Sequence, residues 1–226
     1  VLDAEAGCEL QDVPVAGIST SVRSVVGSKW PMYKAEMTLE LPARFNGSLR
    51  AALAECALMY ASHTVSRLTD SKYDKSVIIS KHKNCEIEWR AMMPTVSTDP
   101  VDFVLSRGYE ICTSDGFEIN VASASLPQEM ANVVVPEVPR EALANLGQEA
   151  VFNRSRLGLH GFRVKGIPGD ETCSRPSLKF SLVLHPVLFG ARVPEFLIRK
   201  ELLLMPSSRL FNWREIFVAG LAPDVV

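Results

Sequence analysis

The chain has 226 residues, 47% of them hydrophobic and 22% charged, a composition typical of a globular protein with a substantial core. Its 24 Lys and Arg residues are balanced by 26 Asp and Glu residues, so no overall field attracts nucleic acid or an anionic membrane. The longest nearly apolar segment, residues 48–62, carries Arg50 and Glu55 and is shorter than the roughly 20 residues that a membrane span requires. We therefore expect no membrane contact and at most weak, local contact with RNA.

Five cysteines are scattered along the chain without a CxxC pair, which favours free thiols in a reducing compartment (Cys8, Cys56, Cys85, Cys112 and Cys173). The first residue is Val1, and neither a basic segment nor an apolar segment typical of a signal peptide follows it. This start indicates either a trimmed chain or a product cut from a longer precursor.

Residues 1–32 contain prolines and glycines among Ser and Val, and they predict an extended N-terminal arm without regular structure. The arm also carries apolar side chains, which we expect neighbouring subunits to cover (Val13, Val15, Ile18, Val22, Val25, Val26 and Trp30). The remaining residues, 33–226, are predicted to form a single β-rich domain.

The first regular elements are a strand and a helix. Apolar and polar residues alternate over residues 33–41, which predicts a half-buried strand that stops at Pro42. Ser48 is placed to cap a helix through Ala61, whose apolar residues recur at helical spacing on one stripe (Leu49, Ala52, Leu53, Cys56 and Tyr60).

Two strands are predicted next, over residues 77–80 and 85–93. In the second strand Glu86 and Glu88 alternate with apolar residues, so we expect these carboxylates to face solvent or a partner rather than to act in acid-base chemistry. Residues 98–108, "TDPVDFVLSRG", have an Asp-Pro start and a Gly stop and predict a short helix.

Residues 109–123, "YEICTSDGFEINVAS", predict a β-hairpin. A two-residue Asp-Gly loop would mix polar and apolar side chains on both faces of the hairpin. A three-residue loop, Ser114 to Gly116, instead places Ile111 opposite Ile119 and Tyr109 opposite Val121. We therefore predict the three-residue loop, with Gly116 at positive φ.

The last third of the chain returns to β-structure. A proline-bearing connection over residues 124–139 and a helix over 140–150 precede strands at 156–166, where glycines indicate bends or bulges, and at 177–185. Residues 195–205 fit a strand or a helix by periodicity, and the flanking prolines favour a strand. Residues 213–220 predict another strand.

No motif points to catalysis, a cofactor or a metal. The four histidines, His63, His82, His160 and His185, have no ligand spacing, and surface or capping roles are expected for them. The glycines of residues 158–169 match no phosphate-binding loop, and the lysines of residues 72–83 lie beside acidic residues on what we predict is a solvated face. We expect no enzyme, and we assign no catalytic, cofactor-binding or metal-binding residue.

The predicted fold class is mainly β, an antiparallel jelly-roll-like sandwich with two or three short helices in its connections, and the alternative is α+β. The strand and helix of residues 34–62, with "KFSLVLHP" at 179–186 and "FNWREIFVAGLAP" at 211–223, resemble elements of the single jelly-roll coat proteins of small icosahedral, picorna-like RNA viruses. Release from a polyprotein would agree with the start at Val1. The arm holds only Arg23 and Lys29 as basic residues, unlike the arginine-rich arm of many RNA-virus coat proteins.

This resemblance implies a structural subunit of a viral capsid, located in the virion and associated with itself or with related coat subunits. The alternative is a non-enzymatic α+β protein that binds a ligand or belongs to a larger cytoplasmic or organellar complex. The surface separates the two hypotheses, because a coat subunit exposes broad apolar patches and a ligand-binding protein has one deep pocket.

Overall fold

The computed structural model describes residues 9–10, 17–62, 65, 68–69, 73–92, 100–112, 118–139, 152–169, 175–187 and 195–220. The elements within these residues are β1 Glu9–Leu10, β2 Ile18–Arg23, β3 Met32–Glu40, a 3-10 helix Ala43–Phe45, α1 Leu49–Ala61, β4 Tyr73–His82, β5 Cys85–Met92, β6 Val101–Cys112, β7 Glu118–Ser125, α3 Gln128–Val134, β8 Asn153–Arg154, β9 Arg156–Ile167, β10 Ser177–Val187 and α5 Glu195–Ala219.

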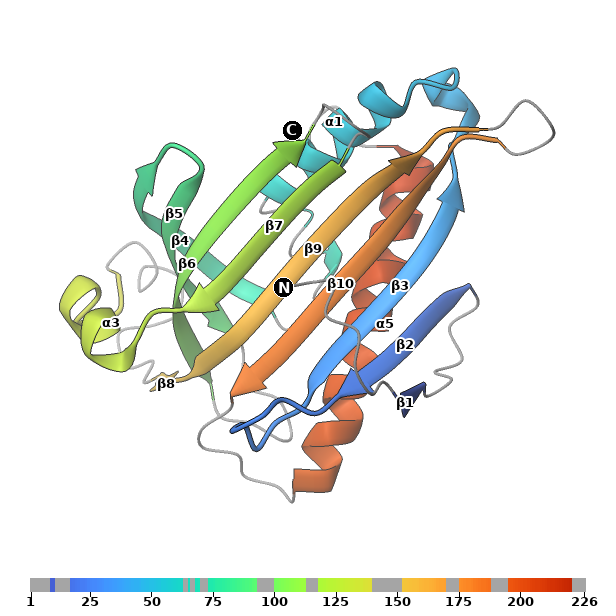
Figure 1. Cartoon of the computed structure of the whole chain (residues 1–226). Coiled ribbons are helices and arrows are strands. Elements are labelled where there is room, and N and C mark those ends of the chain that lie inside the picture. Colours follow the sequence, from blue (N-terminus) through green and yellow to red (C-terminus); the bar gives the residue numbers. More distant parts are fainter. Residues whose placement is uncertain are drawn as a thin grey trace.

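All the described strands belong to one sheet, and helices α1 and α5 lie on the same side of it (Figure 1). The strand order is β1-β2-β3-β10-β9-β7-β6-β5-β4, and neighbours on this path are antiparallel, while the short β8 pairs in parallel with β6. A jelly roll would require two sheets packed face to face. The predicted jelly-roll sandwich is therefore not what the structure shows, and the α+β alternative is the one that fits.

The main hydrophobic core lies between α1, α5 and the face of the sheet that they cover, which we call the inner face. Aromatic rings from the strands and from α5 fill its centre: the Phe180 ring centroid is 4.9 Å from that of Trp213, and Trp213 stacks on Phe217 at 5.2 Å. Phe217 in turn stacks on Phe45 of the 3-10 helix at 5.3 Å. Burial of these large side chains holds α5 against the sheet.

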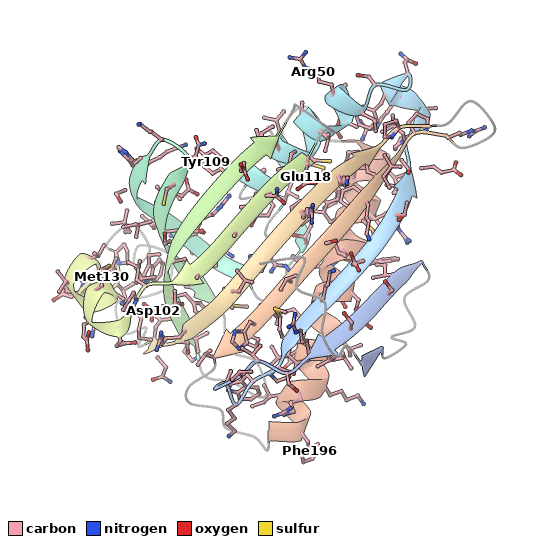
Figure 2. The ribbon with its side chains drawn as sticks, in the orientation of Figure 1. Arg50, Asp102, Tyr109, Glu118, Met130 and Phe196 are labelled. Atoms are coloured by element: carbon pink, nitrogen blue, oxygen red, sulfur yellow. The ribbon has the colours of Figure 1, made fainter. Side chains whose placement is uncertain are left out.

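A smaller core lies on the opposite, outer face, where α3 covers part of β5 and β6. Trp89 is fully buried there, and its indole N–H donates to the Asp102 carboxylate at 2.8 Å. Arg154 of β8 pairs with the same carboxylate at 2.9 Å, so this buried charge is compensated. Figure 2 shows Asp102 at the end of the sheet that lies near α3.

Several predicted elements are confirmed. The strand of residues 33–41 is β3, in which Tyr33, Ala35 and Met37 are buried. The capped helix is α1, whose N-cap Ser48 accepts a hydrogen bond from the Ala51 N–H at 3.2 Å. The strands at 77–80 and 85–93 are β4 and β5, and those at 156–166 and 177–185 are β9 and β10.

The predicted helix over residues 98–108 is wrong, because residues 101–112 form strand β6. Its first five residues, from Val101 to Leu105, are all buried, so the segment is a central strand covered on both faces. Such a strand lacks the polar alternation that identifies a half-buried one.

The predicted strands over residues 195–205 and 213–220 are also wrong, because both segments belong to the single helix α5. Pro206, interpreted as a strand end, lies inside this helix. Proline removes one helical hydrogen bond, and the packing of the helix on the sheet outweighs that loss.

The register of the hairpin is confirmed: Ile111 pairs with Ile119 and Tyr109 with Val121. The loop itself lies outside the described residues, so positive φ at Gly116 stays a prediction. The predicted helix over residues 140–150 also lies outside them. The connection of residues 124–139 contains α3, which was not predicted.

Part of the expected N-terminal arm belongs to the sheet. Strand β2 pairs antiparallel with β3 from Ile18 opposite Met37 to Arg23 opposite Met32. Trp30 is 6% exposed and packs in a cluster with Ile198 and Leu202 of α5. The chain's own helix therefore covers this apolar side chain, a role that the sequence analysis gave to neighbouring subunits.

Candidate functional site

Two adjoining cavities lie on the inner face of the sheet, the outer one beneath α1 and the inner one between α1 and α5. The outer cavity has a volume of about 430 Å³ and the inner cavity about 50 Å³. Tyr60, Arg90 and Arg107 line both, so the two spaces meet at these side chains. Among the described residues the outer cavity is also lined by apolar side chains (Ala57, Ala61, Ile78, Ile111, Ile119 and Val121).

Exposed side chains mark where the outer cavity meets solvent. Ile111 of β6 is 61% exposed and Ile78 of β4 is 38% exposed, although both line the cavity. Lys81 adds an exposed ammonium group at the same rim. Figure 2 shows Tyr109, another lining residue, at the end of β6 that lies towards α1.

The polar residues of β5 point into the outer cavity because side chains alternate along a strand. Trp89 faces outward under α3, so Glu86, Glu88 and Arg90 face inward. Glu86 is only 8% exposed and Glu88 only 1%. The expectation that these carboxylates face solvent is therefore wrong, since both faces of β5 are covered.

Arginines compensate the two buried carboxylates. Arg90 donates to Glu88 through Nη2 at 2.9 and 3.0 Å, and Nη1 of Arg107 lies 3.4 Å from Glu88 and 3.3 Å from Glu86. Burial alone would raise the pKa of Glu88, but the charges of Arg90 and Arg107 lower it below its usual value. The guanidinium of Arg107 also lies over the Tyr60 ring, 4.8 Å from its centroid.

His160 of β9 and Arg209 of α5 meet in the wall of the inner cavity. Arg209 Nη1 lies 3.1 Å from His160 Nε2. A guanidinium can only donate, so Nε2 accepts and the imidazole carries its proton on Nδ1. Burial lowers the pKa of His160 well below its usual value, and the charges of Arg209, Arg90 and Arg107 lower it further, so the ring stays neutral.

The other residues considered for chemistry lie elsewhere. His82 is exposed, and His185 Nε2 lies 2.9 Å from Ser28 Oγ and 3.1 Å from the Trp30 carbonyl. His63 lies outside the described residues. The structure therefore brings none of the three described histidines together as a ligand set, and no group of three His, Cys, Asp or Glu residues able to hold a metal occurs in the described part of the chain.

The predicted free thiols can be followed at two positions. Cys56 and Cys85 are both free. Cys56 is buried in the main core, and this burial raises the pKa of its thiol well above the usual value. The other three cysteine side chains are not described, so the state of all five thiols stays a prediction.

Sequence reasoning missed the charged side chains that meet here, Glu86, Glu88, Arg90, Arg107 and Arg209. Only one ion pair could have been predicted from the sequence. Glu88 and Arg90 are two residues apart in a predicted strand, so these opposite charges lie on the same strand face. Arg107 comes from a segment that was wrongly predicted to be a helix, and Arg209 lies between two wrongly predicted strands, so their convergence could not be inferred.

The cavity between a curved sheet and a long C-terminal helix invites comparison with solved structures. Human StAR-related lipid transfer protein 5 matches with a TM-score of 0.68 and 14% identity, over 96% of this chain and 89% of that one. The lipid transfer and protein localization domain of human StarD13 matches at 0.60 and 12%, over 93% and 90%. This chain has the fold of the StAR-related lipid transfer domains.

A bacterial structure has the same fold. A fragment, residues 25–204, of a STAR-related lipid transfer protein from Xanthomonas axonopodis matches with a TM-score of 0.60 and 15% identity, over 94% of this chain and 99% of that one. No protein-family model matches the sequence, and no curated protein matches it either. The likeness is therefore one of fold, and it indicates no enzyme family.

This fold overturns the capsid hypothesis. The resemblance to viral coat proteins is wrong, and with it the capsid function, the coat-subunit partners and the virion as location, because the structural relatives are lipid transfer domains. No helix within the described residues is long and apolar enough to cross a membrane. The alternative of a non-enzymatic α+β ligand-binding protein fits the fold and the cavity better.

Proposed function

We propose that this protein binds a lipid or a similar amphiphile in the two adjoining cavities and acts as a non-enzymatic carrier of that ligand. The outer cavity carries the proposal, because its volume of about 430 Å³ and its apolar lining are typical of small-molecule sites. The fold shared with lipid transfer domains supports the lipid class. We infer the cytoplasm as the place of action, in keeping with the free Cys56 and Cys85.

The distribution of side chains supports a ligand with two unlike ends. Ile119 and Val121 of β7 offer apolar contacts in the outer cavity, whereas Arg107 and His160 offer charge and hydrogen bonds in the wall of the inner cavity. A purely apolar ligand would leave these polar groups without new partners. An amphiphile matches both regions.

Native mass spectrometry tests this proposal. The purified protein is incubated with vesicles of a total lipid extract, recovered by gel filtration and examined for bound lipid. We expect a bound lipid that dissociates in the gas phase and can be identified by its mass. Recovery of the protein without any bound lipid from the extract would contradict the proposal.

A matched pair of helix α1 variants places the ligand. Ala57 lines the outer cavity, so Ala57→Trp fills part of it and should reduce lipid recovery strongly. Ala54 is exposed on the same helix, so Ala54→Trp should leave recovery unchanged. Circular dichroism confirms that both variants fold. Equal lipid recovery by the two variants would place the lipid elsewhere.

A further inference from the structure

Three buried N–H groups in the wall of the inner cavity have no hydrogen-bond partner among the described residues. They are Arg107 Nε, His160 Nδ1 and Trp213 Nε1. Each is a donor: an arginine and an indole can only donate, and Nδ1 of His160 carries the proton because Nε2 accepts from Arg209. Buried donors without acceptors are rare in proteins, and three around one space indicate a missing acceptor.

The charged side chains that line the inner cavity also favour an acceptor, because they are positive. The described residues that line it include three arginines, Arg90, Arg107 and Arg209, and no carboxylate. The carboxylates of Glu86 and Glu88 line the outer cavity instead, where they pair with Arg90 and Arg107. The inner cavity is therefore rich in donors and positive charge.

The size of the inner cavity limits what can enter. A cavity needs about 10–15 Å³ to hold one water molecule. A cavity of about 50 Å³ therefore holds a group of only a few heavy atoms. A carboxylate or a phosphate has this size and offers only acceptors, and an alcohol brings one donor of its own and no charge.

We propose that the amphiphile carries an anionic acceptor group, a carboxylate or a phosphate, which occupies the inner cavity and accepts hydrogen bonds from Arg107, His160 and Trp213. Its apolar part then extends through the outer cavity towards Ile78 and Ile111 at the rim. This assignment rests on the proposed lipid-binding function and names the chemical class of its ligand.

Isothermal titration calorimetry with ligands that share one chain separates the head groups. Dodecanoate, dodecyl phosphate and dodecanol have the same apolar chain and differ only at the polar end. We expect at least one anionic ligand to bind about 10-fold or more tightly than dodecanol, because hydrogen bonds to a charged group are stronger than neutral ones. The ratio between dodecanoate and dodecyl phosphate then distinguishes a fatty-acid source from a phospholipid source.

Variants locate the anion. Arg107→Gln removes one guanidinium, and Trp213→Phe removes the indole N–H together with the five-membered ring but keeps an aromatic side chain in the core. Each should weaken binding of the preferred anion several-fold and leave dodecanol binding nearly unchanged. Arg163→Gln is the control, because Arg163 pairs with Glu118 on the outer face, at 2.9 Å. It should bind all three ligands as the unmodified protein does.

The outcomes separate this inference from the proposed function. If dodecanol binds as tightly as both anions, the donors are satisfied by water and the anion assignment is wrong, although lipid binding stands. If none of the three ligands binds and no lipid is recovered from the extract, the proposed function fails as well. Equal loss of anion and alcohol binding in Trp213→Phe would show a packing effect and overturn the assignment of the indole donor.

Discussion

The Arg209 guanidinium lies 3.1 Å from His160 Nε2 and thereby joins helix α5 to strand β9 in the wall of the inner cavity. Protonation of His160 would turn this contact into a repulsion, and Arg90 and Arg107 add two further positive charges from β5 and β6. The folded protein therefore keeps His160 neutral, whereas the unfolded chain takes up a proton near the ordinary histidine pKa.

The expected consequence is a stability that falls as the pH drops below about 6.5, by up to about 1.4 kcal/mol per pH unit. The sign follows because the folded-state pKa of His160 is lowered, so the unfolded state binds more protons. Urea denaturation at pH 7 and pH 5 measures the effect. Glu88 does not interfere, since its lowered pKa affects stability only below the unfolded value near 4.5.

His160→Gln is the matched variant for this prediction, because its side-chain carbonyl can accept from Arg209 but does not titrate. It should remove most of the loss of stability between pH 7 and pH 5. An unchanged pH dependence in His160→Gln would assign the effect to another group.

Removing the buried carboxylate of Glu88 should destabilise the fold strongly. Glu88→Ala removes the carboxylate that pairs with Arg90 at 2.9 Å and one of the two carboxylates that Arg107 contacts, and breaking a buried pair in this way costs about 3–5 kcal/mol. Glu40→Ala is the control, because Glu40 and Arg175 form an exposed pair at 3.9 Å. Urea denaturation should show a large loss for the first variant and almost none for the second.

Gly158 should not tolerate a side chain. The register of β9 and β10 shifts here, so that Leu159 and Leu157 pair with His185 and Pro186 and Gly158 is the extra residue of a bulge. A Cβ at this position would lie 2.3 Å from His185 Nδ1. We expect Gly158→Ala to lower the melting temperature, and Gly158→Ala with His185→Ala to recover part of that loss relative to His185→Ala alone.

Gly108 offers the comparison for that experiment. A Cβ there would meet only the Asn84 carbonyl, at 3.8 Å, an ordinary contact. Gly108→Ala should therefore leave the melting temperature unchanged or raise it slightly. A similar loss at both glycines would mean that strand flexibility, rather than contact with His185, determines the effect.

Trp30 should be essential for stability, although it lies in the segment predicted as an arm. It is buried against α5, and large-to-small changes of this kind cost about 3–5 kcal/mol. Trp30→Ala should therefore destabilise the protein strongly, whereas Val26→Ala should not, since Val26 is fully exposed. If both variants are as stable as the parent in thermal denaturation, the segment does not belong to the folded domain.

Local sequence patterns correctly predicted the elements that have one solvent-facing side or an N-cap residue. The alternation of β3 and the Ser48 cap of α1 are properties of neighbouring residues, and the hairpin register followed from matching Ile111 with Ile119. The same reasoning failed for β6, because both of its faces are covered, and for α5, because Pro206 resembled a strand end.

Because β6 and α5 were wrongly predicted, the candidate site could not be predicted either. Arg107 lies on β6 and Arg209 on α5, so neither could be placed near Glu88 before the sheet order was known. The carboxylates of β5 formed a regular polar face, which in isolation is typical of solvent exposure. They are buried because helices cover the inner face, and this tertiary packing cannot be predicted from the residues around β5.

Helix α5 spans two hydrophobic clusters, one on each side of Pro206. Ile198 and Leu202 before the proline pack with Trp30 and Tyr33, and Trp213 after it packs in the main core. Pro206 has no backbone N–H, so the Leu202 carbonyl lacks its helical hydrogen bond, and the helix is least stable between the two clusters. Amide exchange should therefore distinguish the two halves of the helix, each following the free energy of opening of its own cluster.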